Sequence, residues 1–167
     1  VMGDVIVAEL SVDCVTADYC YELQVFDANT GDERFTTSHD NVNDVFLYSV
    51  IQDRKYLLAA SRDVPDLCST CQSALYLWSL DTGDLLHTFD YDGWIDYGAG
   101  EYDLNHDETL LLTHSINDIK HNIVKLWDIE TGQSTAQVDL GDWEIGSVQF
   151  DRSGQHFIIH SGNRVEI

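Results

Sequence analysis

One motif occurs three times in this chain: LQVFDANTGDE from Leu23, LYLWSLDTGD from Leu75 and IVKLWDIETGQ from Ile123. Each copy is an alternating apolar segment that ends in an aromatic residue and then, after a short acidic step, reaches Thr-Gly. Alternation of this kind is typical of a β-strand with one buried face, and Thr-Gly is typical of a tight turn. The motif therefore predicts a strand that runs into a tight turn, three times in succession.

The spacing of the copies predicts the fold. Their aromatic residues, Phe26, Trp78 and Trp127, lie 52 and 49 residues apart, which is in the range of four-stranded propeller blades rather than of helical repeats. We therefore expect an all-β fold and one structural unit, a β-propeller portion of about three and a half four-stranded blades. The expected blades cover residues 1–38, 39–91, 92–141 and 142–167.

The apolar pattern gives 14 expected strands, three in the first blade, four in each of the next two, and three in the last. They are 4–11, 22–27, 33–37, 45–50, 56–61, 74–80, 85–89, 98–104, 110–115, 123–129, 134–140, 145–150, 156–160 and 164–167. A propeller closes into a ring because open strand edges invite pairing with other chains. We therefore expect this piece to belong to a longer ring or to be completed by another chain.

The chain resembles the WD-repeat family over nearly its whole length, most specifically from His39 to Ile129. Ser38-His39 stands where that family has Gly-His, and Trp127-Asp128 is the Trp-Asp dipeptide itself. In the family, His, Ser, Asp and Trp side chains form a hydrogen-bonded brace inside the blade. The resemblance implies this structural role for His39, Ser61, Asp63 and Trp78 in one blade, and for Ser115, Asp118 and Trp127 in the next.

The charge is strongly negative, with 30 acidic residues against eight Lys and Arg, a formal net charge of −22. Nucleic acids and anionic membranes bind through clusters of Lys and Arg, so we expect neither as a partner. The composition favours a basic protein or peptide. Two other interpretations stay open, a solvated acidic shell without a specific partner and an adaptation to high salt.

Four cysteines lie in two long insertions between expected strands: Cys14 and Cys20 in the first, Cys68 and Cys71 in the second. Three interpretations compete. Local disulfides would staple each insertion and indicate an extracellular protein, whereas the WD-repeat resemblance favours an intracellular one. A shared zinc site would use the thiolates as tetrahedral ligands, and His121 lies at the matching place in the third repeat. A redox Cys-x-x-Cys is the third interpretation.

Two tryptophans fall in the expected connections between blades, and each has acidic neighbours. Trp94 stands between Asp92 and Asp96, and Trp143 stands between Asp142 and Glu144. An aromatic face beside carboxylates suits a cationic side chain, through cation-π attraction and ion pairing. We expect these residues to form a binding face, shared with the cysteine insertions, on which at least one indole is exposed. The alternative is that both indoles pack against the neighbouring blade.

No catalytic signature is found: no His-Glu-x-x-His metalloprotease motif, nucleophile elbow, phosphate loop or dinucleotide fingerprint occurs. We therefore expect a non-enzymatic protein-interaction scaffold without a cofactor, zinc being the one alternative. Two other functions stay open. The chain could be a structural subunit of a larger assembly or filament completed by neighbouring chains, or a propeller enzyme or metal-binding module whose site lies outside this segment.

Overall fold

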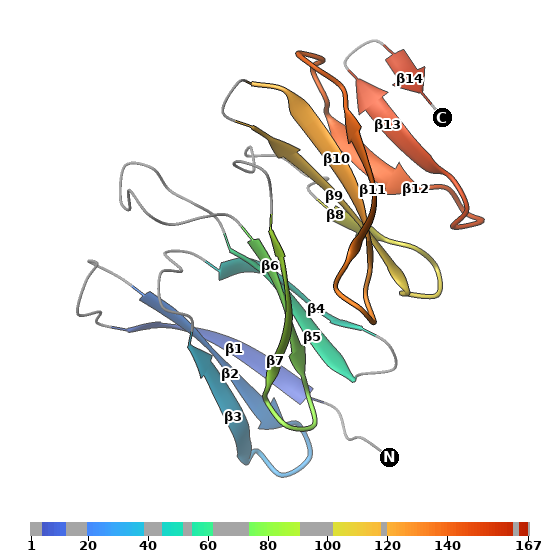
Figure 1. Cartoon of the computed structure of the whole chain (residues 1–167). Coiled ribbons are helices and arrows are strands. Elements are labelled where there is room, and N and C mark those ends of the chain that lie inside the picture. The colour runs from blue at the N-terminus through green and yellow to red at the C-terminus, as the bar shows by residue number, and fades with distance from the viewer. Residues whose placement is uncertain are drawn as a thin grey trace. The chain divides into compact units, whose positions relative to one another are not determined.

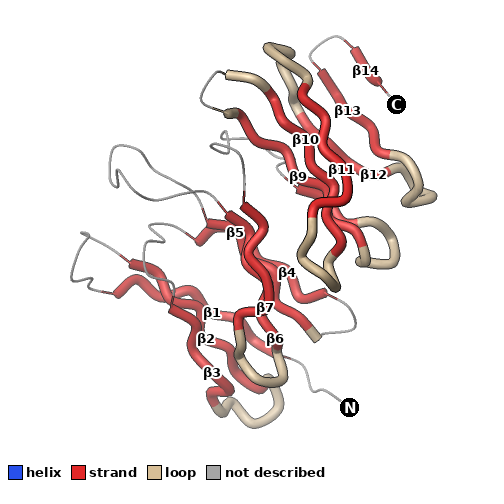
Figure 2. Tube along the Cα trace, viewed as in Figure 1, coloured by secondary structure: helices blue, strands red, loops and turns tan. Residues whose placement is uncertain are grey.

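The computed structural model describes residues 5–12, 20–38, 45–51, 55–61, 74–90, 102–117, 120–161 and 164–166. These ranges contain 14 strands in four sheets and no helix (Figure 2). Every strand pair with a described register is antiparallel. The expected all-β fold is therefore confirmed, and the described ranges hold no helix that could span a membrane.

Where the sequence predicts one unit, the chain forms two compact units, Val1–Thr88 and Phe89–Ile167, and the boundary falls within β7. The first sheet contains β1 (Val5–Val12), β2 (Cys20–Asp27) and β3 (Glu33–Ser38); the second contains β4 (Val45–Ile51), β5 (Tyr56–Ser61), β6 (Ala74–Ser79) and β7 (Leu85–Asp90). The third contains β8 (Tyr102–Leu104), β9 (Leu110–Ile116), β10 (Asn122–Asp128) and β11 (Ser134–Asp139); the fourth contains β12 (Ser147–Phe150), β13 (Phe157–Ser161) and β14 (Arg164–Glu166).

Neighbouring strands of each sheet follow one another in the chain, so every sheet is a simple meander (Figure 1). The grouping into three, four, four and three strands is the grouping that the sequence predicts. Strand bounds agree with the expected ones to within two residues, apart from the start of β8, where 98–101 lie outside the described residues. The assignment of these sheets to propeller blades stays a prediction.

The Thr-Gly motif forms the same turn three times, between β2 and β3, β6 and β7, and β10 and β11. The first residue of each turn is Asp27, Ser79 or Asp128, and the glycine is Gly31, Gly83 or Gly132. In each turn the first residue donates its backbone N–H to the carbonyl of the sixth residue, at 2.9, 2.9 and 3.0 Å in chain order. The carbonyl of the first residue accepts the glycine N–H, at 2.8, 2.8 and 2.9 Å. Its side-chain oxygen also accepts backbone N–H groups of the turn. The motif is therefore explained by turn chemistry, since each glycine has a φ of +68° or +77°.

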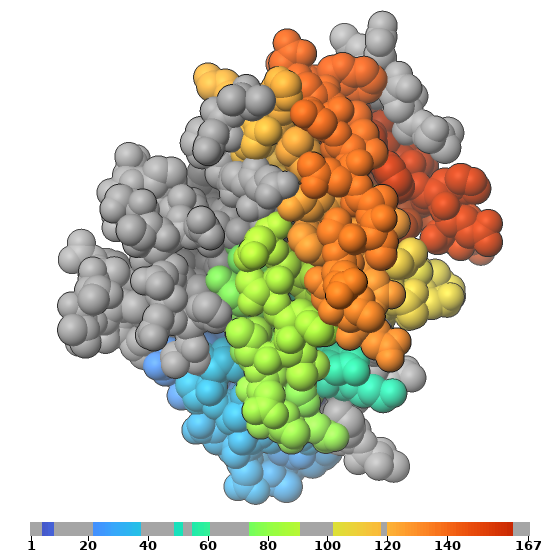
Figure 3. Space-filling model, in the orientation of Figure 1, coloured from blue at the N-terminus to red at the C-terminus, as the bar shows by residue number. Residues whose placement is uncertain are grey.

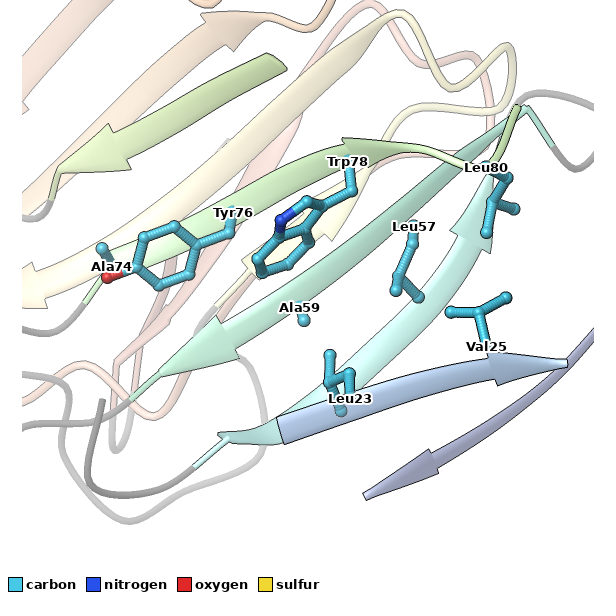
Figure 4. Close-up of a cluster of buried hydrophobic side chains, with 8 residues drawn as sticks. All are labelled: Leu23, Val25, Leu57, Ala59, Ala74, Tyr76, Trp78 and Leu80. Atoms are coloured by element: carbon cyan, nitrogen blue, oxygen red, sulfur yellow. The ribbon is translucent and has the colours of Figure 1, made fainter. Parts of the chain in front are cut away.

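The core of the first unit lies between its two sheets (Figure 4). The buried side chains come from β2, β5, β6 and the turn after β6; they are Leu23, Val25, Leu57, Ala59, Ala74, Tyr76, Trp78 and Leu80. Within each strand they are spaced two residues apart, so each strand turns one face toward the opposite sheet. Trp78 is 5% exposed, and its ring centroid lies 5.5 Å from that of Tyr76. Trp78 is thus a core residue.

The second unit has its own core between the sheet of β8 to β11 and the sheet of β12 to β14. Its buried members are Leu112, Val124, Val148 and Ile159. The side chain of Asp103 on β8 links the two sheets further, because its Oδ2 accepts the Phe150 N–H of β12 at 2.7 Å. This core fixes the position of the connection between β11 and β12, because Leu140 and Ile145 of that connection pack against it.

Candidate functional site

The three described indoles have different surroundings. Trp78 and Trp127 are 5% and 7% exposed, whereas Trp143 is 38% exposed. Trp94, with Asp92 and Asp96, lies outside the described residues. Among the described tryptophans, Trp143 is therefore the one whose indole can be reached by a partner, and its neighbours Asp142 and Glu144 are exposed as well.

Trp143 lies in the β11–β12 connection, Gly141–Gly146 (GDWEIG), which we call the acidic tryptophan segment. Both ends of the segment are anchored in the second unit. Leu140, just before it, and Ile145, within it, pack against the core cluster. Gly141 has a φ of +65°, a conformation that favours glycine, and Gly146 donates its N–H to the His160 carbonyl at 2.8 Å. The indole is thus exposed from a segment that is held on both sides.

The middle of the segment is held by Asn122, the first residue of β10. Its side chain is buried, at 6% exposure. The amide Nδ2 donates to the Trp143 carbonyl at 2.5 Å and to the Gly141 carbonyl at 3.3 Å, and the Asn122 backbone N–H also donates to Gly141 O at 2.7 Å. Sequence reasoning missed this residue, because an asparagine at the start of a strand carries no sign of a partner 21 residues away.

These contacts also determine the hydrogen-bonding state of His114 on β9. Both carbonyl oxygens are acceptors, so the NH₂ group of Asn122 must face them and its Oδ1 must face His114. His114 Nε2 lies 2.8 Å from that Oδ1. Because Oδ1 can only accept, Nε2 carries the proton and donates it. His114, Asn122 and the Trp143 carbonyl therefore form a chain of hydrogen bonds from β9 to the surface segment.

Asp139, the last residue of β11, holds the start of the segment. Its Oδ1 accepts the Gly141 N–H at 2.8 Å, and its Oδ2 lies 3.1 Å from Nδ1 of His121. The Gly141 N–H, and after it His121, lower the pKa of Asp139. The carboxylate therefore stays charged at neutral pH. His121, which the sequence aligns with the cysteine insertions, is in the structure the partner of Asp139.

The hydroxyl group that bonds the Trp127 indole is not that of Ser115, the serine of the expected brace. The indole Nε1 donates to Thr113 Oγ1 at 2.9 Å, rather than to Ser115. Strand register explains the choice: Trp127 pairs with Leu111, so Thr113 is its diagonal neighbour on the same face. Ser115 is buried at 3% exposure, but it lies four residues from Leu111, about 13 Å along the strand.

Lys125 and Phe89 complete the surroundings of the Trp127 ring. The Lys125 Nζ lies 5.1 Å from the ring centroid, and Phe89 approaches edge-on with centroids 5.6 Å apart. Of the other expected brace residues, Trp78 is buried in the first unit. His39, Asp63 and Asp118 lie outside the described residues, and Ser61 is the last residue of β5, with its side chain outside the description.

The cysteine site stays a prediction. Cys14, Cys68 and Cys71 lie outside the described residues, and Cys20 begins β2 without a described side chain. In the ranges that the structure describes, His, Cys, Asp and Glu form no group of three or more that could hold a metal ion.

Comparison with known proteins shows similarity in fold alone. No family model matches the chain, and no curated protein matches it. Among solved structures, Kuenenia stuttgartiensis hydrazine synthase is similar, with a TM-score of 0.56 and 14% sequence identity over 92% of this chain. The chain spans 40% of the length of that structure. A likeness at this identity shows a common fold and carries over no activity.

Proposed function

We propose that this chain is a WD-repeat-like propeller portion that serves as a non-enzymatic protein-interaction scaffold. The meander of every sheet and the turn repeated between β2 and β3, β6 and β7, and β10 and β11 support the propeller. The acidic tryptophan segment is the proposed contact surface. One observation carries this assignment: Trp143 is 38% exposed although Leu140 before it and Ile145 after it pack against the core.

The chemistry of the segment favours a basic side chain as its ligand. A lysine or arginine over the face of an indole gains about 0.5 to 1 kcal/mol at an exposed site, and about 2 kcal/mol when water is excluded. Asp142 and Glu144 are exposed on either side of Trp143, and their charges favour the same ligand. Aromatic residues of this kind are typical anchors of protein interfaces, where truncation costs about 2 kcal/mol or more.

A second candidate function is a structural subunit completed by neighbouring chains. The sheets of β1 to β3 and of β12 to β14 have three described strands each, one fewer than the other two sheets. In addition, β11 is the last strand of its sheet and all six of its residues are exposed; this part of the chain lies at the surface in the space-filling view (Figure 3). Exposed edges pair readily with another strand.

The affinity for a basic peptide tests the first function. We would titrate the chain with a synthetic peptide of three arginines separated by glycines, in about 0.15 M salt, so that long-range attraction to the net charge is screened. Trp143→Ala should weaken binding about tenfold or more, and Trp143→Phe should weaken it less, because an aromatic face remains. Asp142→Asn should weaken binding more than Asp107→Asn, which removes one exposed charge elsewhere in the same unit.

Equal affinities of wild type and Trp143→Ala would refute the proposed contact surface. The second candidate has a separate test, because completion by neighbouring chains depends on concentration. Sedimentation should then show association as concentration rises, and a monomer at every concentration would contradict it.

A further inference from the structure

We infer that Asn122 and His114 are positioning residues for the acidic tryptophan segment, fixing the direction in which the Trp143 indole leaves the surface. The inference rests on the proposed function, in which that indole contacts a partner. Its basis is the chain of hydrogen bonds from His114 Nε2 to Asn122 Oδ1, and from Asn122 Nδ2 to the carbonyls of Gly141 and Trp143.

The Trp143 carbonyl is the point at which Asn122 acts. A hydrogen bond to this group restrains the peptide plane that follows Trp143, while the indole itself stays exposed. Leu140 and Ile145 anchor the two ends of the segment, and hydrogen bonds to Asp139 and to the Asn122 backbone hold Gly141. The bond from Asn122 Nδ2 extends this restraint to the Trp143 carbonyl. An indole held in one orientation loses less conformational entropy when it binds a partner.

We call the two hydrogen bonds from Asn122 Nδ2 to the carbonyls of Gly141 and Trp143 the Asn122 clamp. Because the side chain is buried, the clamp requires an amide. At 6% exposure, a donor or acceptor of Asn122 that lost its partner would have no bulk water to replace it. Asparagine matches the three neighbours, since it offers two N–H donors toward the carbonyls and one acceptor toward His114. An aspartate of the same shape would keep the acceptor but turn a carboxylate oxygen toward two carbonyl oxygens. Asn122→Asp therefore converts the clamp into a repulsive contact with little change in volume.

The matched control is Asn105, a second buried asparagine of the same unit. It is 8% exposed and its amide is bonded within its own turn: Oδ1 accepts the N–H groups of Thr109 and Leu110, and Nδ2 donates to Thr109 Oγ1. Asn105→Ala thus removes buried hydrogen bonds from the unit without touching the segment. It separates a general loss of stability from a specific loss of Trp143 orientation.

His114 provides a second pair of variants. Glutamine can place an N–H near the position of the histidine Nε2, whereas leucine cannot donate. His114→Gln should therefore preserve the orientation of Asn122, and His114→Leu should loosen it. This pair keeps the hypothesis testable even where Asn122 variants fail to fold.

The readout is ¹⁹F NMR of the full chain labelled with 5-fluorotryptophan, with the resonances assigned by Trp→Phe variants. We expect the Trp143 resonance to shift or broaden in Asn122→Asp, Asn122→Ala and His114→Leu, and to stay in place in Asn105→Ala and His114→Gln. The Trp127 resonance reports whether the core of the second unit is intact. A Trp143 resonance unchanged in Asn122→Asp, or moved equally by Asn105→Ala, would overturn the inference.

Titration with the arginine peptide separates this inference from the proposed function. Asn122→Asp should weaken peptide binding about tenfold, because the anchor is no longer preorganised. If the resonance moves as expected but wild type binds no peptide, the clamp is real and the proposed function is wrong. If wild type binds through Trp143 and the Asn122 variants bind equally well, the proposed function stands and the positioning role is wrong.

Discussion

Trp127 and Trp143 belong to the same unit, lie 16 residues apart, and each has an aspartate beside it in the chain. Trp127 sits on β10, where its N–H reaches Thr113 and its ring contacts Lys125 and Phe89. Trp143 sits in the β11–β12 connection, where the hydrogen bond from Asn122 is made to its backbone and the indole stays exposed.

The two indoles have different roles because the fold places them in different surroundings. On the strand, neighbouring side chains surround the indole and satisfy its N–H group, so its contribution is to stability. In the β11–β12 connection, Asn122 forms a hydrogen bond with the Trp143 backbone carbonyl, and the aromatic face of Trp143 is left exposed to solvent. The residue types alone cannot distinguish a buried indole from an exposed one, because Trp127-Asp128 and Asp142-Trp143 contain the same two residues.

Truncation of Trp127 and truncation of Trp143 should differ strongly in their cost to stability. Trp127→Ala should lower the free energy of unfolding by about 3 to 5 kcal/mol, because it leaves a cavity, and Trp78→Ala should do the same in the first unit. Trp143→Ala should cost about 1 kcal/mol or less. Denaturant unfolding of the three variants measures these values, and similar losses for Trp127→Ala and Trp143→Ala would show that Trp143 is as important for stability as Trp127.

The hydrogen bond of the buried indole gives the next largest effect. Thr113→Val keeps the shape of the side chain but leaves the Trp127 N–H without its acceptor, at a cost of about 1 to 3 kcal/mol. Thr113→Ser keeps a hydroxyl and should be markedly more stable than the valine variant. If Ser115→Ala destabilised the unit more than Thr113→Val, the brace around Trp127 would be the one that the sequence predicts.

Two glycines of the repeated turn also differ in their surroundings: Gly83 is packed against a side chain, and Gly31 is not. Gly31 and Gly83 both have a φ of +77°, but a Cβ at Gly83 would lie 2.9 Å from Phe35 Cγ, whereas one at Gly31 would meet nothing within 4 Å. Gly31→Ala should cost about 1 kcal/mol through backbone strain alone. Gly83→Ala should cost about 1 kcal/mol more, since Phe35 packs against the core. Equal thermal midpoints would show that Phe35 moves aside freely.

Asp27 is a carboxylate that the fold uses, because it forms an ion pair with Arg34. Its contribution to stability should be small and should depend on pH. Arg34, and then the Asn29 N–H, lower the pKa of Asp27 to about 2. Because the folded-state pKa is lowered, the carboxylate stabilises the fold above pH 4 or so, and this contribution is lost as pH falls from about 4 to about 2. The stability difference between wild type and Asp27→Asn should shrink over that range, and Arg34→Gln should behave similarly. A difference that does not change with pH would contradict this.

Much of the fold could be predicted because it depends on local patterns. Alternation gave the strands, and the Thr-Gly motif gave the turns in which Asp27 and Asp128 accept backbone N–H groups. The acidic tryptophan segment was also visible, since Trp143 stands between two acidic residues outside the strand pattern.

The rest depends on contacts between residues distant in the chain. Asn122 meets Trp143 only because β10 and β11 pair in one particular register, and periodicity does not specify register in such detail. Thr113 rather than Ser115 bonds Trp127 for the same reason. The division into two units likewise depends on how the sheets pack, which the repeat spacing does not contain.

Titration of the 5-fluorotryptophan-labelled chain with the arginine peptide, followed by ¹⁹F NMR in about 0.15 M salt, tests whether Trp143 contacts the ligand. If Trp143 is a contact residue and Trp127 a core residue, the Trp143 resonance should shift saturably while those of Trp127 and Trp78 stay in place. A Trp143 resonance that does not move at saturating peptide, or a shift shared equally by all three indoles, would contradict the assignment of Trp143 as the contact residue.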